Sequence, residues 1–391
     1  MRVCVCGLGP GDERYLTREV RDRLAGADRI LTSLKDRDFL GDKAHYLPLS
    51  EMLSFLRVHR DADMDVVVAA SGDTGFYSIA STIRRTFPDQ DITFLPGVSS
   101  LSLLAARTGL GYEDARLISL HGRAGDPVPY VTYNEKVFML TGGEQGVEAI
   151  ISRLTSTGLR RKVTLYIGEK LGLPGEKITV GRVSELEGLS FQEPVSLLAC
   201  NEDPTDPFRH FRDEDFIRGK APMTKETVRD LVVSQLAPQP TDTIYDIGAG
   251  TGAVSCAIAQ RLREGILYAI EKEADRVRLI RENIEETGSY NIEVREGEAP
   301  EGMDDLPAPD RVFIGGSSGN MAAIVDSCLS KNADAVFVVT AISLETLEEA
   351  RELFAQRNRE TDICCVNAAK ARKLGSYHLM QAENPVYIIR A

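Results

Sequence analysis

The sequence lacks the features that would tie a protein to a membrane, a metal ion or an oxidising compartment. No apolar run approaches the roughly 20 residues that a membrane-spanning helix needs. The five histidines show no ligand spacing, and the seven cysteines include no Cys-x-x-Cys pair, which is typical of free thiols in a reducing compartment. The first residues lack the longer apolar segment of a signal peptide. We therefore expect a cytoplasmic protein that binds no membrane and no metal.

Positive charge is also in short supply. The chain has 46 Lys and Arg residues against 59 Asp and Glu residues, which gives a net charge of −13. A surface of that sign repels nucleic acid, and the sequence shows no interleaving of basic and aromatic residues. These two observations disfavour an enzyme that acts on RNA. A local basic patch could still hold a small acidic molecule.

The length and the pattern of the chain predict two domains joined by a linker. With 391 residues, the chain exceeds the roughly 250 to 300 residues that one hydrophobic core usually holds. Residues 1–203 alternate short Val- and Leu-rich segments with helical ones, and residues 223–391 repeat this α/β rhythm with unrelated sequences. Residues 204–222 contain three prolines and many charges but little periodic apolar content, so we interpret them as the linker.

The second domain contains a glycine loop, DIGAGTG at residues 246–252, directly after a predicted buried strand. Glycine permits the positive φ of a tight turn from strand to helix and lets a ligand approach bare backbone. Glu271 ends the next strand and could accept the two ribose hydroxyls of an adenosyl group. The loop alone also fits NAD, because Ala253 satisfies the looser G-x-G-x-x-G/A form.

The residues around this loop favour S-adenosylmethionine, which carries a sulfonium and an amino group but no phosphates. Glu298 and Ala299 follow the third strand, where they could border an adenine. Asp246 stands directly before the glycines and could face a cationic centre. The predicted cofactor-binding residues here are Asp246, Gly248, Ala249, Gly250, Thr251, Gly252, Glu271, Glu298 and Ala299.

The second domain resembles the decarboxylating half of the precorrin-6Y C5,15-methyltransferase family. The resemblance spans nearly all of residues 223–390 and rests on DIGAGTG, GEAPE at 297–301, RVFIGGSSG at 311–319, VTAISLET at 339–346 and NPVYII at 384–389. PMTKETVR at 222–229 also matches, and the resemblance implies that its Thr224 touches the methyl donor. The family usually has Asp where this chain has Glu298. The resemblance implies a Rossmann-like class I methyltransferase fold.

The first domain has three loops of small residues, each after a predicted strand: CGLGPGD at 6–12, ASGDTG at 70–75 and LPGVSS at 95–100. Pro10 removes an amide donor, which makes a phosphate cradle improbable. The three loops in order resemble the tetrapyrrole methylase family. The resemblance implies that the methyl donor is surrounded by Pro10, Gly72, Asp73, Phe76, Ser99 and Ser100 and covered by Leu140. Taken singly, Asp73 also fits a turn former and the serines fit helix N-caps.

Together the two resemblances imply a bifunctional enzyme of cobalamin biosynthesis. It would methylate a polycarboxylate tetrapyrrole at C5 and C15 with S-adenosylmethionine and remove the carboxyl group of the C12 acetate, and it would form a homo-oligomer. Two alternatives remain open: one half could be a degenerate scaffold, or the second half could bind NAD. No catalytic base is assigned. The cations expected to hold substrate carboxylates are Lys225, Arg229, Lys370, Arg372, Lys373 and Arg123, and the histidines that could shuttle protons are His121 and His378.

Overall fold

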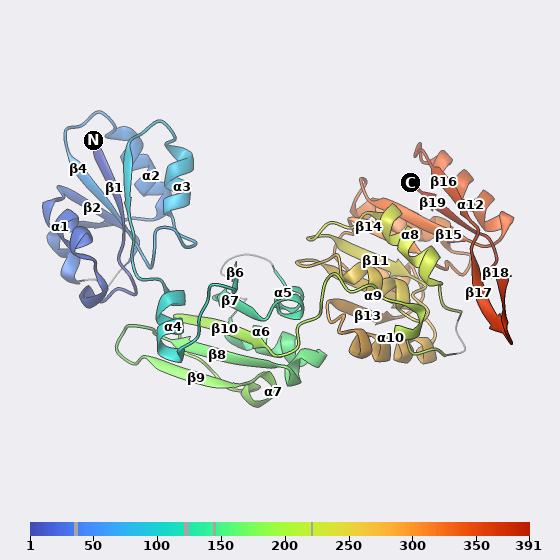
Figure 1. The fold of residues 1–391 in the computed structure, drawn as a ribbon. Helices are drawn as coiled ribbons and strands as arrows, with labels where there is room; N and C mark the ends of the chain where they lie inside the picture. Colours follow the sequence, from blue (N-terminus) through green and yellow to red (C-terminus); the bar gives the residue numbers. More distant parts are fainter. Residues whose placement is uncertain (35–37, 121–124, 144–145, 220–221) are drawn as a thin grey trace. The chain divides into compact units, whose positions relative to one another are not determined.

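The computed structural model describes residues 1–34, 38–120, 125–143, 146–219 and 222–391, and Figure 1 shows the fold. The chain forms two compact units. Unit 1 consists of Met1–Gly125, Glu135–Thr155 and Val163–Glu202. Unit 2 consists of Asp126–Asn134, Ser156–Lys162 and Asp203–Ala391. The two short segments of unit 2 lie inside residues 1–203, which the sequence pattern predicts as one domain. The pattern misses them because a linear sequence does not show which core a segment joins.

Unit 1 contains two sheets, and the first is parallel throughout, with the order β3-β2-β4-β1-β5. Val3 and Val5 pack with helices α2 and α3 on one face, while Cys4 and Cys6 pack with α1 on the other, as the two-residue period of a strand requires. The strands are β1 (Arg2–Gly7), β2 (Arg29–Thr32), β3 (Ala44–Tyr46), β4 (Asp65–Ala70) and β5 (Ile92–Leu95), and the helices are α1 (Arg18–Gly26), α2 (Leu49–Val58) and α3 (Ala80–Thr86).

The second sheet of unit 1 is mixed, with the order β6-β7-β10-β8-β9. Only the β6–β7 pair is parallel. Helix α4 packs against β8 and β10 of this sheet. The strands are β6 (Arg116–Ser119), β7 (Lys136–Leu140), β8 (Val163–Glu169), β9 (Lys177–Arg182) and β10 (Val195–Asn201), and the helices are α4 (Ser100–Thr108), α6 (Val147–Thr155) and α7 (Val183–Leu186).

Unit 2 is built on a seven-stranded sheet with the order β13-β12-β11-β14-β15-β19-β16. All neighbours are parallel except that β19 runs antiparallel to both β15 and β16. Strands β19 and β16 thus form an antiparallel edge of the sheet. The strands are β11 (Thr243–Ile247), β12 (Ile266–Glu271), β13 (Ile292–Glu296), β14 (Arg311–Ile314), β15 (Val336–Ala341), β16 (Asp362–Val366) and β19 (Val386–Arg390).

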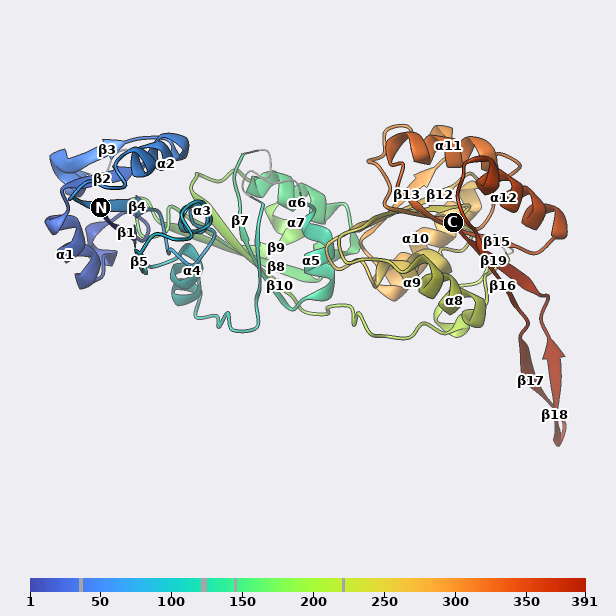
Figure 2. The same cartoon turned by 90° about the horizontal axis from the view of Figure 1, so that it is seen from above.

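Helices cover both faces of this sheet, which gives a doubly wound fold (Figures 1 and 2). Helices α11 and α12 bury Met321, Ile324, Ala350 and Phe354 in one apolar cluster with residues of β11, β14 and β15. Helices α8, α9 and α10 lie together on the other face. The helices of unit 2 are α5 (Pro127–Tyr133), α8 (Glu226–Leu236), α9 (Ala253–Ala259), α10 (Ala274–Thr287), α11 (Met321–Lys331) and α12 (Leu344–Gln356).

A two-stranded hairpin, β17 (Ala369–Leu374) and β18 (Tyr377–Ala382), projects from the body of unit 2 (Figure 2). Every residue of both strands is exposed. The sequence analysis does not predict these strands, because a ribbon exposed on both faces shows no alternation of buried and polar residues.

Residues 204–219 of the segment predicted as a linker belong to unit 2 and pack on it. The side chains of Phe211 and Phe216 are 3% and 4% exposed. The amide of Ile217 donates a hydrogen bond of 2.7 Å to Asn283 on α10. This arm is therefore part of the unit that holds the glycine loop.

Candidate functional site

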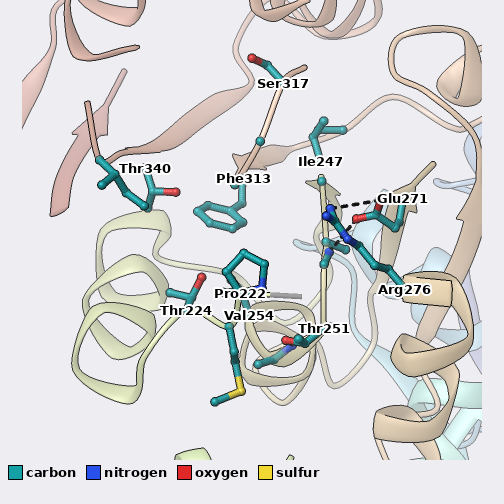
Figure 3. A pocket seen from close by; sticks show the side chains of 18 of the residues that line it. Pro222, Thr224, Ile247, Thr251, Val254, Glu271, Arg276, Phe313, Ser317 and Thr340 are labelled. Carbon is teal, nitrogen blue, oxygen red and sulfur yellow. Dashed lines mark hydrogen bonds and ion pairs between the residues drawn. The ribbon is translucent and has the colours of Figure 1, made fainter. Parts of the chain in front are cut away.

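The main cavity of unit 2 has a volume of about 640 Å³ and lies where the strand order of the sheet reverses, at the carboxyl ends of β11 and β14. Such a switch point is where doubly wound folds bind their ligands. Figure 3 shows side chains from β11, β12, β14, β15 and the segment that precedes α8 around this space. Its wall includes eight of the predicted residues: Thr224, Gly248, Ala249, Gly250, Thr251, Glu271, Glu298 and Ala299.

The backbone geometry of the glycine loop requires glycine. Gly248, Gly250 and Gly252 have φ values of 71°, 60° and 76°, a region that residues with a Cβ seldom adopt. A Cβ on Gly248 would also lie 2.5 Å from the carbonyl oxygen of Gly316, on the loop after β14. Gly252 caps α9 and stands outside the cavity wall. The loop therefore presents bare backbone to the cavity.

Glu271 holds this loop in place. Its side chain is 3% exposed, and its Oε2 accepts a hydrogen bond of 2.9 Å from the amide of Gly250 (Figure 3). Its Oε1 accepts one of 3.0 Å from the amide of Glu273 and lies 3.9 Å from Arg276. A carboxylate has about four acceptor sites, so Glu271 keeps capacity for a ligand in the cavity. Glu298 pairs with Lys272 at 3.1 Å, and both residues line the cavity.

Thr224 is positioned by a buried ion pair behind the cavity. The Arg229 side chain is fully buried, and its Nη1 donates hydrogen bonds to the carbonyl of Thr224 at 3.0 Å and to Asp213 at 3.2 Å. Asp213, from the arm, also accepts from the amide of Glu226 at the start of α8. The prediction that Arg229 holds a substrate carboxylate is therefore wrong, because its side chain is fully buried and lies outside the cavity wall.

Asp246 does not face the cavity. The residue has no exposed surface, and its Oδ2 accepts a hydrogen bond of 2.5 Å from Ser255 on α9, while its Oδ1 has no hydrogen-bond partner. Burial, together with the neighbouring charge of Glu271, raises the pKa of Asp246 to about 7, against the lowering effect of the Ser255 hydrogen bond. Asp246 is not among the residues that line the cavity, and its contact with a cationic centre stays a prediction.

Replacing Asp246 with asparagine is expected to remove a pH-dependent loss of stability. The folded-state pKa of Asp246 lies above its ordinary value of 3.8, so only the unfolded chain ionises between about pH 4 and pH 7, and stability falls across that window. Relative to the wild type, the free energy of unfolding of Asp246→Asn should therefore rise by up to roughly 4 kcal/mol between pH 4 and pH 8. Urea unfolding at both pH values measures it, with the exposed Asp275→Asn as control. Parallel pH profiles for Asp246→Asn and the wild type would contradict this reading.

Several wall residues escaped the sequence analysis. They are Phe313, Ser317, Thr340, Ile342 and Asn384. Phe313 and Thr340 lie at or next to the ends of β14 and β15, so the rule that ligands sit at the carboxyl ends of central strands could have found them. Asn384 reaches the wall from the β18–β19 connection, which the strand pattern alone does not place.

The remaining predicted cations and histidines lie in different parts of the chain, and two of the cations lie in or near the cavity. Lys225 lines the cavity, and Lys370 lies 3.4 Å from Asp213. Arg372, Lys373 and His378 are exposed on the β17–β18 hairpin. Arg123 and His121 lie outside the described residues. Throughout residues 1–34, 38–120, 125–143, 146–219 and 222–391, no group of three or more His, Cys, Asp or Glu side chains could hold a metal ion.

In unit 1 the three small-residue loops meet, as the sequence analysis predicts, because β4, β1 and β5 are neighbours in one parallel sheet. The backbones of Gly9 and Gly72 exchange hydrogen bonds of 2.8 and 3.1 Å. A Cβ on Gly7 would lie 2.6 Å from the carbonyl oxygen of Gly72 and 2.7 Å from the amide of Gly97. The loops are therefore packed backbone against backbone.

The polar side chains of these loops accept hydrogen bonds from nearby backbone amides. Asp73 accepts hydrogen bonds from the amides of Gly75 at 2.6 Å and Gly97 at 3.0 Å. Ser99 caps α4 by accepting from the amide of Ser102 at 3.1 Å, and Ser100 is the first residue of that helix. Both local roles match the turn-former and N-cap alternatives. Asp73 thereby ties the second loop to the third.

The other predicted residues of unit 1 surround the same place. Phe76 and Leu140 pack against one apolar cluster, and the rings of Phe76 and Phe138 have centroids 5.7 Å apart. Pro10 faces the loop after β8, because a Cβ on Gly172 would lie 2.5 Å from its Cγ. The structure thus brings Pro10, Gly72, Asp73, Phe76, Ser99 and Leu140 to the region between the two sheets of unit 1.

Comparison with known proteins gives a consistent result for both halves. Residues 2–187 match the family described as tetrapyrrole (corrin/porphyrin) methylases, and residues 215–391 match the precorrin methyltransferase domain. A precorrin-6Y C(5,15)-methyltransferase [decarboxylating] of Sinorhizobium is 33% identical over 276 residues, which cover 68% of this chain and 66% of the relative. The Mycobacterium tuberculosis protein of the same name is 28% identical and is covered over 88% of both chains.

A shorter relative matches the second half alone. A probable cobalt-precorrin-6B C(15)-methyltransferase (decarboxylating) of Sulfurisphaera tokodaii is 36% identical over 180 residues, which cover 45% of this chain and 94% of the relative.

In the part of the chain that the structure describes, no helix is long and apolar enough to cross a bilayer.

The fold and the glycine-lined cavity define unit 2 as a Rossmann-like methyltransferase domain. The chain belongs to the tetrapyrrole methylases through its N-terminal half and to the decarboxylating precorrin methyltransferases through its C-terminal half.

Proposed function

We propose that this chain is a bifunctional methyltransferase of cobalamin biosynthesis that acts on a precorrin-type tetrapyrrole. The N-terminal half methylates C5, and the C-terminal half methylates C15 and releases the C12 acetate carboxyl group as carbon dioxide. The observation that carries the proposal is the cavity of unit 2, whose wall combines the bare glycine loop with Glu271 and Thr224. The relatives named for both methylations, at C5 and at C15, support it.

S-adenosylmethionine fits the residues of this cavity. A volume of about 640 Å³ lies within the range of small-molecule sites. The wall offers the Glu271 carboxylate, which can accept the ribose hydroxyls of an adenosyl group, and the apolar side chains of Val254, Ile270 and Phe313. Gly248 to Thr251 and Glu271 would hold the adenosyl part, and Thr224 would lie beside it. When bound, this cofactor supplies an electrophilic methyl group on a sulfonium.

The residues of the chain contribute by positioning. Methyl transfer to a nucleophilic ring carbon needs the two reactants aligned and held, and alignment alone contributes several kcal/mol of the rate acceleration. Glu271 fixes the glycine loop through the amide of Gly250, and the Arg229–Asp213 pair fixes Thr224. The aromatic ring of Phe313 and the side chain of Ile247 make this part of the wall apolar. No residue is assigned as a base.

Labelled methyl transfer tests the proposal and separates the two halves. With a ¹³C-methyl donor and a precorrin substrate, the wild type should add two labelled methyl groups and release one carbon dioxide. Gly97→Ala should abolish C5 methylation and keep C15 methylation with carbon dioxide release, because a Cβ there collides with the backbones of Gly72 and Gly7. Gly26→Ala, where a Cβ meets nothing within 4 Å, is the matched control. A wild type that transfers no methyl group to a precorrin would overturn the proposal.

A further inference from the structure

A second cavity of unit 2, with a volume of about 490 Å³, borders the first. The two cavities share Lys225, Ala382 and Glu383 in their walls. Eight of the ten residues that line the second cavity are charged, and together the wall consists of Arg212, Asp213, Glu214, Arg218, Lys225, Glu226, Lys370, Gln381, Ala382 and Glu383. The first cavity is mainly backbone and apolar side chains, so the two compartments differ in chemistry.

Most of the acids in the second cavity are already paired with cations. Four cations and four acids line it, but Asp213 is paired with the buried Arg229, which stands outside the wall. Glu226 likewise accepts a hydrogen bond of 3.1 Å from His210, which is also outside the wall. Glu214 lies 3.8 Å from Arg212.

Two cations of the wall have capacity for a ligand. In the described residues, Lys225 makes no ion pair, and Arg218 donates only to the carbonyl of Asp213, at 3.1 Å. Lys370 is held differently, because Asp213 lies at 3.4 Å and Glu226 at 3.9 Å. Lys225 stands in the wall common to both cavities, where it can reach a molecule that extends from one into the other.

The rim of the first cavity suits a ligand larger than that cavity. Ile342 lines the cavity and is 70% exposed, and Leu344, two residues on, is 66% exposed. These two side chains give the rim an apolar surface beside the cavity. A flat apolar ring could rest there while its polar substituents extend toward the charged cavity.

We propose that the second cavity is a subsite for carboxylate side chains of the acceptor substrate, which Lys225 and Arg218 bind. This inference rests on the proposed function, because it takes the acceptor to be a ring that bears several acidic chains. Arg218 offers a planar fork of donors that matches a carboxylate, and Lys225 offers a mobile ammonium. Lys370, fixed by Asp213 and Glu226, contributes positive field from the root of the hairpin.

Carbon dioxide release by the full chain tests this subsite, because in the proposed function only the C-terminal half decarboxylates. Arg218→Ala and Lys225→Ala should each raise the KM for the precorrin substrate about tenfold, the effect of losing one charged hydrogen bond. The KM for S-adenosylmethionine should change less than about twofold in Arg218→Ala, since that residue lines only the second cavity. Arg218→Lys should recover part of the loss.

Arg351→Ala is the matched control, because Arg351 lines neither cavity and pairs with Glu348 on the surface. Added salt should raise the wild-type KM for the precorrin more steeply than that of Arg218→Ala, since one cation fewer is screened. An unchanged precorrin KM in both Arg218→Ala and Lys225→Ala would overturn the subsite and leave the proposed function intact. A wild type that releases no carbon dioxide would instead contradict the proposed function.

Discussion

Replacing Gly248 with alanine is expected to remove methyl-donor binding from unit 2 while leaving unit 1 unaffected. A residue with a Cβ at φ 71° costs roughly 1–2 kcal/mol, and this Cβ would also lie 2.5 Å from the carbonyl oxygen of Gly316. The loops after β11 and β14 must then separate, which changes the wall on both sides of the ligand. Affinity for S-adenosylhomocysteine at this site should fall by about thirtyfold or more. Calorimetry on the full chain measures the loss.

Gly302→Ala is the control for this substitution. A Cβ on Gly302 would meet its nearest atom at 3.5 Å, an ordinary contact, and Gly302 does not line the cavity. Its affinity for S-adenosylhomocysteine should match that of the wild type within about twofold. Equal binding by Gly248→Ala and Gly302→Ala would show that the glycine loop does not hold the donor.

The second large effect is expected at Asp213. Asp213→Ala leaves the Arg229 guanidinium, whose side chain is fully buried, without its carboxylate. Removing one member of a buried ion pair typically costs about 3–5 kcal/mol. Because Asp213 also accepts from the amide of Glu226, the start of α8 loses its side-chain acceptor as well. The free energy of unfolding of unit 2 should fall by that amount, and donor affinity should fall with it, since Arg229 positions the Thr224 carbonyl.

Urea unfolding followed by circular dichroism, together with hydrogen exchange of the α8 amides, measures this change. The exposed pair Arg351–Glu348 supplies the control, and Glu348→Ala should cost less than about 1 kcal/mol. The double variant Asp213→Ala with Arg229→Met should recover part of the loss, because no unpaired charge then remains buried. If Asp213→Ala is no more destabilising than Glu348→Ala, the arm is not anchored through this pair.

Much of the fold follows from local patterns in the sequence. The Val- and Leu-rich segments that predict strands are β1, β4, β5, β7, β8 and β10 in unit 1, and in unit 2 the predicted segments match all seven strands of the main sheet. Most of these strands bury several residues, which gives them a recognisable Val-, Ile- and Leu-rich composition. The strands β2, β3, β6 and β9 carry weaker patterns and are not predicted.

Local sequence patterns predict only some of the residues at the cavity of unit 2. The glycines of DIGAGTG and Glu271 could be predicted because backbone geometry and strand ends impose those residue types. The burial of Asp246 could not, since its neighbour Ile247 lines the cavity while Asp246 itself is fully buried outside the wall. Arg229 is predicted to hold a substrate carboxylate because no sequence pattern shows that Asp213, sixteen residues earlier, accepts its hydrogen bond.

The central claim is that each half of the chain binds its own methyl donor, and the stoichiometry of S-adenosylhomocysteine binding tests it most directly. Calorimetry on the full chain should find two sites, of which Gly97→Ala removes one and Gly248→Ala removes the other. A single site in the wild type, or one that binds a nicotinamide dinucleotide in place of S-adenosylhomocysteine, would contradict the account.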